Sequence, residues 1–252
     1  MRTQELGDLC DRNYLAAFAA LVPHVAGSAG GRRSFGPVDA VVTLLPRAFY
    51  NPVFVTNDRT LPEEVKAAVE WVSSLGVPAS VQLRDGLQQR FGRVLRQLRL
   101  EPDPWVTPGM ALYPIPERPR PPVGLHLELV CPDTFEDWHA GIGYPSSFRG
   151  VYGPTLLDDT AFRLIVGYAD EEPVTGAAAI IHDEVVGIYA VGTVEHARRR
   201  GFGQAATWAA IQAGADAGCT VSVLQATDEA VSVYQRMGFS EVSRYLEWMP
   251  PD

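Results

Sequence analysis

The sequence has few cysteines, no long apolar run and almost no lysine. Cys10, Cys131 and Cys219 lie far apart without a CxxC pair, so we expect three buried thiols in a reducing, cytoplasmic compartment rather than a disulfide framework. No uncharged apolar stretch reaches ~18 residues, which argues against a membrane span. The acidic start MRTQELGDLCDRN is unlike a signal peptide.

Basic charge and histidine are also scarce. The 30 acidic residues outnumber the 21 basic ones and give a net charge of −9, so we expect no nucleic-acid partner. The five histidines show neither HxxxH nor HxH spacing, so we expect no metal site. Lys66 is the only lysine, and this arginine bias with heavy alanine use is typical of a GC-rich bacterial genome.

Prolines divide the 252 residues into two parts. Eight of the 20 prolines fall between Pro102 and Pro122 and end in PIPERPRPP, a sequence typical of an extended, stiff connector. Residues 1–122 contain 14 basic and 12 acidic residues, whereas residues 123–252 contain 7 and 18. We therefore predict two domains, 1–122, which ends in the proline-rich linker, and 123–252.

The hydrophobic pattern predicts an α/β fold in both domains. In the first domain we expect strands at 38–45, 53–56, 79–83 and 105–113 and helices at 61–75 and 87–98. In the second we expect strands at 125–130, 161–169, 174–182, 185–194, 220–225 and 242–249 and helices at 133–142, 203–217 and 228–237. Short turns join the strands between 161 and 194, which predicts antiparallel pairing there. A shift of about 139 positions overlays the element order of the two domains, which indicates a duplication, with two unrelated α/β domains as the alternative.

The segment RRRGFG, at 198–203, follows an apolar strand and opens an alanine-rich helix. Two glycines separated by one residue let successive backbone N–H groups point into one concavity. The helix N-terminus and three arginines add positive charge, so the segment predicts a pyrophosphate site. A glycine-rich turn with solvated arginines is the alternative. No GK[ST] follows, and Ala206 stands where a dinucleotide fingerprint needs glycine.

These residues resemble the GNAT superfamily of N-acetyltransferases. Arg198-x-x-Gly201-x-Gly203 matches its signature [RQ]-x-x-G-x-[GA], and A-x-x-V-Y-x-x-x-G-F at 230–239 is similar to its second signature. The resemblance implies a GNAT-like fold, with two similar halves built on a central mixed, mostly antiparallel sheet flanked by helices. It implies an acetyl-CoA-dependent N-acetyltransferase, in which a primary amine attacks the acetyl donor directly.

The resemblance also implies roles for individual residues. Tyr234 would protonate the departing thiolate, because a phenol with a pKa near ~10 carries a proton at neutral pH; packing in the core is its alternative role. Tyr189 lies on the strand where relatives often carry the base. The implied acetyl-CoA contacts are Val191, Gly192, Thr193, Arg198, Arg199, Arg200, Gly201, Phe202, Gly203, Gln204, Thr227 and Ala230.

The sequence departs from the family pattern at two places. Thr227 stands where an asparagine often touches the acetyl-CoA arm, and it is equally suited to cap the helix that follows. Gly187 and Tyr189 occupy the places of a frequent Glu or His base. Proton removal then passes through water near Tyr189, Glu184 or His182, or the amine arrives neutral.

The first domain lacks this chemistry. TNDRTLP replaces the glycine turn, its Asp58 and the following Glu63 and Glu64 would repel a pyrophosphate, and Leu95 replaces the tyrosine. We therefore expect a degenerate N-terminal half, as in tandem GNAT proteins.

The remaining expectations concern partners. The acceptor is expected to be a small-molecule amine, cationic or neutral, because acids dominate the second domain. We expect no membrane partner and either a monomer with pseudo-dimeric halves or a homodimer. The sequence leaves open the identity of the acyl group. A non-catalytic CoA-binding regulatory or scaffolding protein is the alternative to an enzyme.

Overall fold

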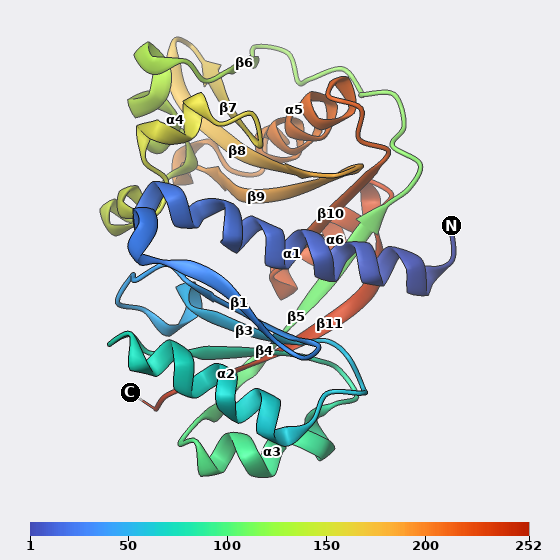
Figure 1. Ribbon diagram of the computed structural model, residues 1–252. Helices are drawn as coiled ribbons and strands as arrows, with labels where there is room; N and C mark the ends of the chain where they lie inside the picture. The colour runs from blue at the N-terminus through green and yellow to red at the C-terminus, as the bar shows by residue number, and fades with distance from the viewer. Residues whose placement is uncertain (252) are drawn as a thin grey trace. The chain divides into compact units, whose positions relative to one another are not determined.

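The computed structural model describes residues 1–251, which contain six α-helices and eleven strands (Figure 1). They form two compact units that are not consecutive parts of the chain. We call N-unit the residues 3–110 and 226–231 with the segment from Glu241 onward, and C-unit the residues 111–225 and 232–240 with the first two residues. The predicted boundary at residue 122 lies in the segment 113–125, which has neither helix nor strand.

The N-unit is a mixed sheet with helices on both faces. Its elements are α1 (Thr3–Val25), β1 (Gly31–Phe35), β2 (Val38–Val42), β3 (Pro52–Val55), α2 (Pro62–Ser74), β4 (Ser80–Arg84), α3 (Gln88–Gln97), β5 (Glu101–Leu112) and β11 (Ser240–Met249). The strand order is β1-β2-β3-β4-β11-β5. β3 and β4 are parallel, whereas β11 pairs antiparallel with β4, from Tyr245↔Arg84 to Trp248↔Val81. This pairing assigns the C-terminal strand to the N-unit.

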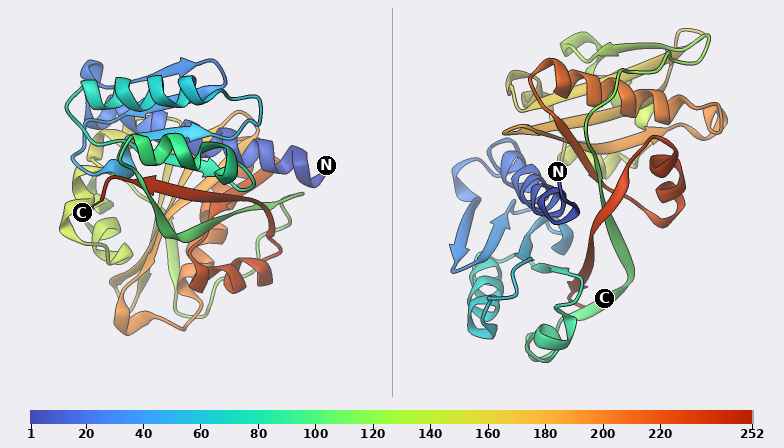
Figure 2. Two further views of the ribbon diagram at one scale, coloured as in Figure 1. Left: turned by 90° about the horizontal axis from the view of Figure 1, so that it is seen from below. Right: turned by 90° about the vertical axis from the view of Figure 1, so that its right-hand side faces the viewer.

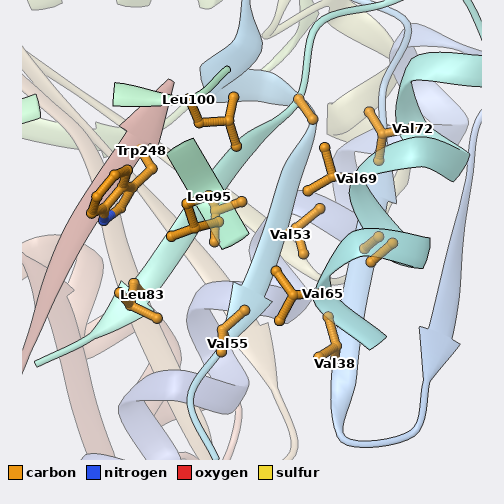
Figure 3. Packing of buried hydrophobic residues seen from close by; sticks show 14 of the residues in the cluster. Val38, Val53, Val55, Val65, Val69, Val72, Leu83, Leu95, Leu100 and Trp248 are labelled. Atoms are coloured by element: carbon orange, nitrogen blue, oxygen red, sulfur yellow. The ribbon is translucent and has the colours of Figure 1, made fainter. Parts of the chain in front are cut away.

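The core of the N-unit lies between the sheet and the helices α2 and α3 (Figure 3). Val65, Val69 and Val72 recur at helical spacing on α2 and form its buried stripe. They pack against alternate residues of the strands, such as Val53 and Val55 on β3, because side chains i and i+2 share one face of a strand.

Helix α1 covers the opposite face of the N-unit sheet (Figures 1 and 2). The Tyr14 ring contacts Phe54 and Tyr245 at 5.2 and 5.1 Å between ring centroids. This face also carries polar groups: the buried Asp11 accepts hydrogen bonds from the Tyr245 hydroxyl at 2.5 Å and from Arg84 at 3.0 Å. Burial raises the pKa of Asp11, against the hydrogen bond from Tyr245 and the Arg84 charge.

The C-unit contains parallel and antiparallel strands in the order β10-β9-β8-β7-β6. Its elements are β6 (His126–Leu129), α4 (Phe135–Ile142), β7 (Phe162–Ala169), β8 (Glu172–His182), β9 (Val185–Thr193), α5 (Phe202–Asp216), β10 (Val221–Gln225) and the end of α6 (Asp228–Arg236). Only the β9–β10 pair is parallel. Helices α4 and α5 lie on opposite faces (Figure 1). Close contacts fix both: Gly176 of β8 lies against Trp138 of α4, and Gly214 of α5 against Val186 of β9.

The structure confirms the predicted α/β fold, with most element bounds shifted by a few residues. The order β2-β3-α2-β4-α3-β5 recurs along the chain as β8-β9-α5-β10-α6-β11, which gives the two similar halves. Neither α1 nor β1 was predicted.

Two further corrections concern β5 and Cys131. β5 begins at Glu101, not at 105, and includes Pro102, Pro104 and Pro108. These prolines are spaced by even numbers, so their missing N–H groups all face one edge of the strand. Cys131 is exposed, while Cys10 and Cys219 are buried as expected. Among the described helices, none has both the length and the apolarity for a membrane span.

The position of Glu247 on β11, opposite Gln82 of β4, gives a test of this strand assignment. Burial and the Asp103 charge raise the pKa of Glu247 to about 7. The folded protein therefore binds this proton more tightly than the unfolded chain, and the free energy of unfolding falls as pH rises from 4.5 to 7. Glu247→Gln should raise the free energy of unfolding at pH 8 by on the order of 1–3 kcal/mol and leave it nearly unchanged at pH 4. Urea unfolding at both pH values measures the effect. The exposed Glu101→Gln is the matched control, and an equal response of the two variants would contradict the assignment.

Candidate active site

The last part of β9 extends beyond its pairing with the neighbouring strand β10. The two strands pair from Val185↔Val221 to Ile188↔Leu224, whereas β9 continues to Thr193. A β-bulge follows the last pair: Gly176 faces Gly192 and Ala178 faces Tyr189, so Ala177 opposes two residues, Ala190 and Val191. Ala190 has a φ of 50°, which side-chain-bearing residues rarely adopt. The bulge bends the strand and opens its edge beyond Ile188.

The opened edge presents backbone groups of Val191 and Thr193. Gly192 pairs with Gly176 of β8, and the Val194 N–H donates to the Val174 carbonyl. Because hydrogen-bonding direction alternates along a strand, Val191 and Thr193 face away from β8. The Tyr144 hydroxyl donates to the Val191 carbonyl at 3.1 Å, and Arg198 Nε donates to the Thr193 carbonyl at 3.1 Å. The edge that β10 has left is therefore polar.

A glycine is required at position 192 by the close approach of α4. A Cβ there would lie 2.0 Å from the Ile142 carbonyl oxygen, and a Cβ on Gly141 would lie 2.8 Å from the Thr175 carbonyl oxygen. The Thr175 hydroxyl donates to the Gly192 carbonyl at 2.7 Å. The end of α4 is thus packed directly on the backbone of the bulge.

The turn between β9 and α5, which we call the cradle, has the backbone geometry that the predicted anion site requires. Arg199 and Gly201 have φ values of 62° and 80°, so the backbone alternates in hand and gathers successive N–H groups into a nest. The first helical bond of α5 runs from the Ala205 N–H to the Gly201 carbonyl, which leaves the N–H groups of the first turn available to an anion.

The side chains of this turn have different surroundings. The side chains of Arg198, Arg199 and Arg200 are exposed, and the Arg200 guanidinium lies over the Phe202 ring, 4.5 Å from its centroid. Phe202 is itself buried, so only its backbone faces the cradle. A Cβ on Gly203 would lie 3.1 Å from Thr193 Oγ1, so the start of α5 lies directly against the end of β9.

Two phenols are close to the opened strand edge. Tyr234 lies near the end of α6, its ring packed edge-on against Phe239. Burial and the neighbouring Tyr144 raise the pKa of Tyr234 to about 12, and the Thr207 hydroxyl beside it opposes the shift. Sequence reasoning missed Tyr144, which follows α4 and has no recognisable signature around it.

The remaining predicted residues fall into two groups. Tyr189 lies at the bulge, and Gly187 is paired in the closed part of β9. His182 and Glu184 belong to the β8–β9 turn, at the other end of β9, roughly 20 Å along the strand from Val191. Thr227 and Ala230 belong to the N-unit, where the Thr227 carbonyl accepts the first hydrogen bonds of α6 from Ala230 and Val231, at the N-cap position.

The N-unit counterpart of the cradle is occupied by the chain itself. The Leu61 N–H donates to Glu64 Oε2 at 2.8 Å, so a carboxylate of α2 fills the start of its own helix. β3 pairs with β4 over its whole length, and Leu95 is buried in the core. No opened strand edge of the β9 kind exists between β3 and β4. Within residues 1–251, no cluster of His, Cys, Asp and Glu is suited to a metal ion.

Gly192→Ala should damage this site, because its Cβ meets the Ile142 carbonyl, which the α4 backbone holds in place. We expect a loss of about 1–3 kcal/mol in the free energy of unfolding and weaker acetyl-CoA binding, measured by thermal unfolding and calorimetry. Gly150→Ala is the control, since a Cβ there meets nothing within 4 Å. Equal behaviour of both variants would contradict the close approach.

Comparisons with known proteins agree with this geometry. Residues 127–239 match the model of the acetyltransferase (GNAT) family. No curated protein matches the chain by sequence. A solved GCN5-related N-acetyltransferase from Kribbella flavida is 22% identical with a TM-score of 0.70, covering 94% of this chain and 95% of its own.

Two other solved structures have the same fold. A tandem GNAT protein from the clavulanic acid biosynthesis pathway has a TM-score of 0.60 at 12% identity and covers 97% of both chains. A GCN5-related N-acetyltransferase from Sphaerobacter thermophilus has a TM-score of 0.61 at 18% identity, covering 84% of this chain and 76% of its own. Residues 127–239 thus match the acetyltransferase (GNAT) family model, and the chain has the fold of these solved structures.

Proposed function

We propose that the C-unit transfers an acetyl group from acetyl-CoA to a primary amine, by direct attack of the amine. One observation carries the proposal: the edge of β9 opens at the bulge next to the nest of Arg199 and Gly201. An extended polyamide with a pyrophosphate at one end requires a strand edge and an anion cradle in this order. The thioester of acetyl-CoA supplies the activated acetyl group.

The backbone of this chain provides the binding groups. The N–H groups at the start of α5 bind the pyrophosphate, with the exposed arginines 198–200 around it. Val191 and Thr193 face the opened edge and pair with the amides of the pantetheine arm. The bond from Arg198 to the Thr193 carbonyl ties the cradle to the strand, so both parts keep a fixed spacing.

Tyr234 is the proton donor to the leaving thiolate in this proposal. Its pKa of about 12 keeps the phenol protonated throughout the working range. The donor side of the site therefore does not titrate below about pH 10.

β9 carries no carboxylate or imidazole that could remove the proton from the amine. His182 and Glu184 lie at the far end of the strand, and Tyr189 alone of the considered groups lies at the bulge. We propose that the amine loses its proton to water near Tyr189 or arrives neutral.

The acceptor is proposed to be a small amine, cationic or neutral, rather than an anion. Residues 123–252 contain 18 acidic and 7 basic residues, and three of the basic residues surround the cradle. An acidic surface raises the local concentration of ammonium groups and repels carboxylates.

A titration and an acceptor screen test the function. Calorimetry with acetyl-CoA should give one site per chain, because Glu64 fills the corresponding place in the N-unit. CoA release should then be measured with polyamines, aminoglycosides and glutamate at low and high salt. Cationic amines should lead at low salt and lose part of that lead as salt screens the charges. Two equivalent sites, or a preference for glutamate at both salt levels, would contradict the proposal.

The alternative is a CoA-binding regulatory or scaffolding protein without turnover. The absence of a Glu or His at Gly187 and Tyr189 favours it. Tight acetyl-CoA binding without CoA release in the full amine screen would support this alternative.

Tyr234→Phe should lower kcat by about 10²-fold or more while the KM for acetyl-CoA changes little, because only the proton is removed. Steady-state kinetics measure the split. Tyr168→Phe is the control, since its hydroxyl bonds Asp137 on the β7–α4 side of the unit. An unchanged kcat would indicate that Tyr234 only packs in the core and does not donate the proton.

The pH dependence of kcat/KM should have an ascending limb only. Activity rises with pH as the acceptor amine loses its proton, and no descending limb should follow below about pH 10, because Tyr234 retains its proton there. A descending limb near pH 8 would show that a group with a lower pKa donates the proton.

A further inference from the structure

The proline-rich connector, residues 118–122, lies against the start of α5. A cavity of about 160 Å³ separates them, bounded by the connector on one side and by Gly201, Gln204 and Trp208 on the other. A Cβ on Gly201 would lie 3.6 Å from Pro122 Cγ. The connector therefore forms one side of a cavity next to the anion cradle, in addition to joining the two parts of the sequence.

This cavity has basic side chains and no acidic ones in its lining. Arg118 is half-buried and Arg120 is exposed, and both line it. Within residues 1–251, neither arginine is paired with an acidic side chain. Gly201, which also lines the cavity, directly follows Arg199 and Arg200 in the chain, and the side chains of both are exposed.

Prolines fix the path of the two arginines. Pro119, Pro121 and Pro122 alternate with or follow them, and proline restricts the backbone to an extended conformation with little freedom to lose on binding. A ligand group held between Arg118 and Arg120 thus costs less ordering entropy than one held by a glycine-rich loop.

We infer that Arg118 and Arg120 bind the phosphate monoester on the ribose of CoA, an inference that rests on the proposed function. This group is separate from the pyrophosphate and carries about −1.5 to −2 charges near neutral pH. The pyrophosphate occupies the nest at Arg199 and Gly201, and the adjoining cavity accepts the monoester. The connector arginines then determine the preference for CoA over dephospho-CoA, which lacks only this phosphate.

Calorimetric titration of the full chain with CoA and with dephospho-CoA tests the inference. The wild-type protein should bind CoA about tenfold or more tightly than dephospho-CoA. The double variant Arg118→Gln/Arg120→Gln should bind both ligands with equal affinity, close to the wild-type affinity for dephospho-CoA. The charge-matched control, Arg93→Gln together with Arg99→Gln, replaces two exposed arginines of the N-unit and should keep the wild-type ratio.

The outcomes separate the two proposals. A wild-type ratio near one, or an unchanged ratio in the double variant, overturns the role of the connector and leaves acetyl-CoA binding intact. Failure of the wild-type protein to bind either ligand overturns the proposed function and this inference together. Circular dichroism of the double variant checks that the two substitutions leave the fold unchanged.

Discussion

The contact of α4 with the bulged backbone of β9 is the constraint on which the C-unit site depends. The Ile142 carbonyl occupies the space above Gly192, and Thr175 and Tyr144 donate to the carbonyls of Gly192 and Val191. These contacts hold Ala190 at a positive φ that it would not adopt alone. The bulge in turn separates β9 from β10 and directs Val191 and Thr193 toward the opening. The packing of α4 on this face of the sheet thus stabilises Ala190 in a strained backbone conformation.

The N-unit has the same element order but, within its described residues, no strained bulge of this kind. β3 and β4 stay paired, and Glu64 satisfies the start of α2 from within the helix. Each change removes a feature that a ligand would otherwise fill: an open strand edge in one case and a free helix N-terminus in the other. Both are stabilising for the unit itself, since backbone groups gain protein partners. Of the two units, the C-unit therefore keeps an open strand edge and a free helix N-terminus, whereas the N-unit satisfies both within the protein.

Charge in the C-unit follows the same division. Five arginines lie at the cradle and along the connector, at 118, 120 and 198–200, while acidic residues outnumber basic ones in 123–252. Near the opened edge, burial raises the pKa of Tyr234 to about 12, so this phenol is neutral at physiological pH. In the proposed function, the site thus combines basic side chains near the phosphates with a protonated phenol at Tyr234.

The sequence alone determined the α/β fold, the positions of most elements and the glycine turn before α5. These are local properties: the spacing of apolar residues sets helices and strands, and the glycines of RRRGFG set the turn whatever surrounds it. The absence of a glycine turn in the first domain could be predicted for the same reason. Glu63 and Glu64 lie in the first turn of α2 itself.

Tertiary structure alone decided the rest. The sequence could not assign β11 to the N-unit, since strand pairing joins residues such as Trp248 and Val81 that are far apart in the chain. It could not find Tyr144, whose role depends on a single hydrogen bond to the Val191 carbonyl. It also described Arg118 and Arg120 as part of a spacer, because only the packed connector brings them to Gly201. Long-range pairing and side-chain direction are set by the whole fold, and no local pattern records them.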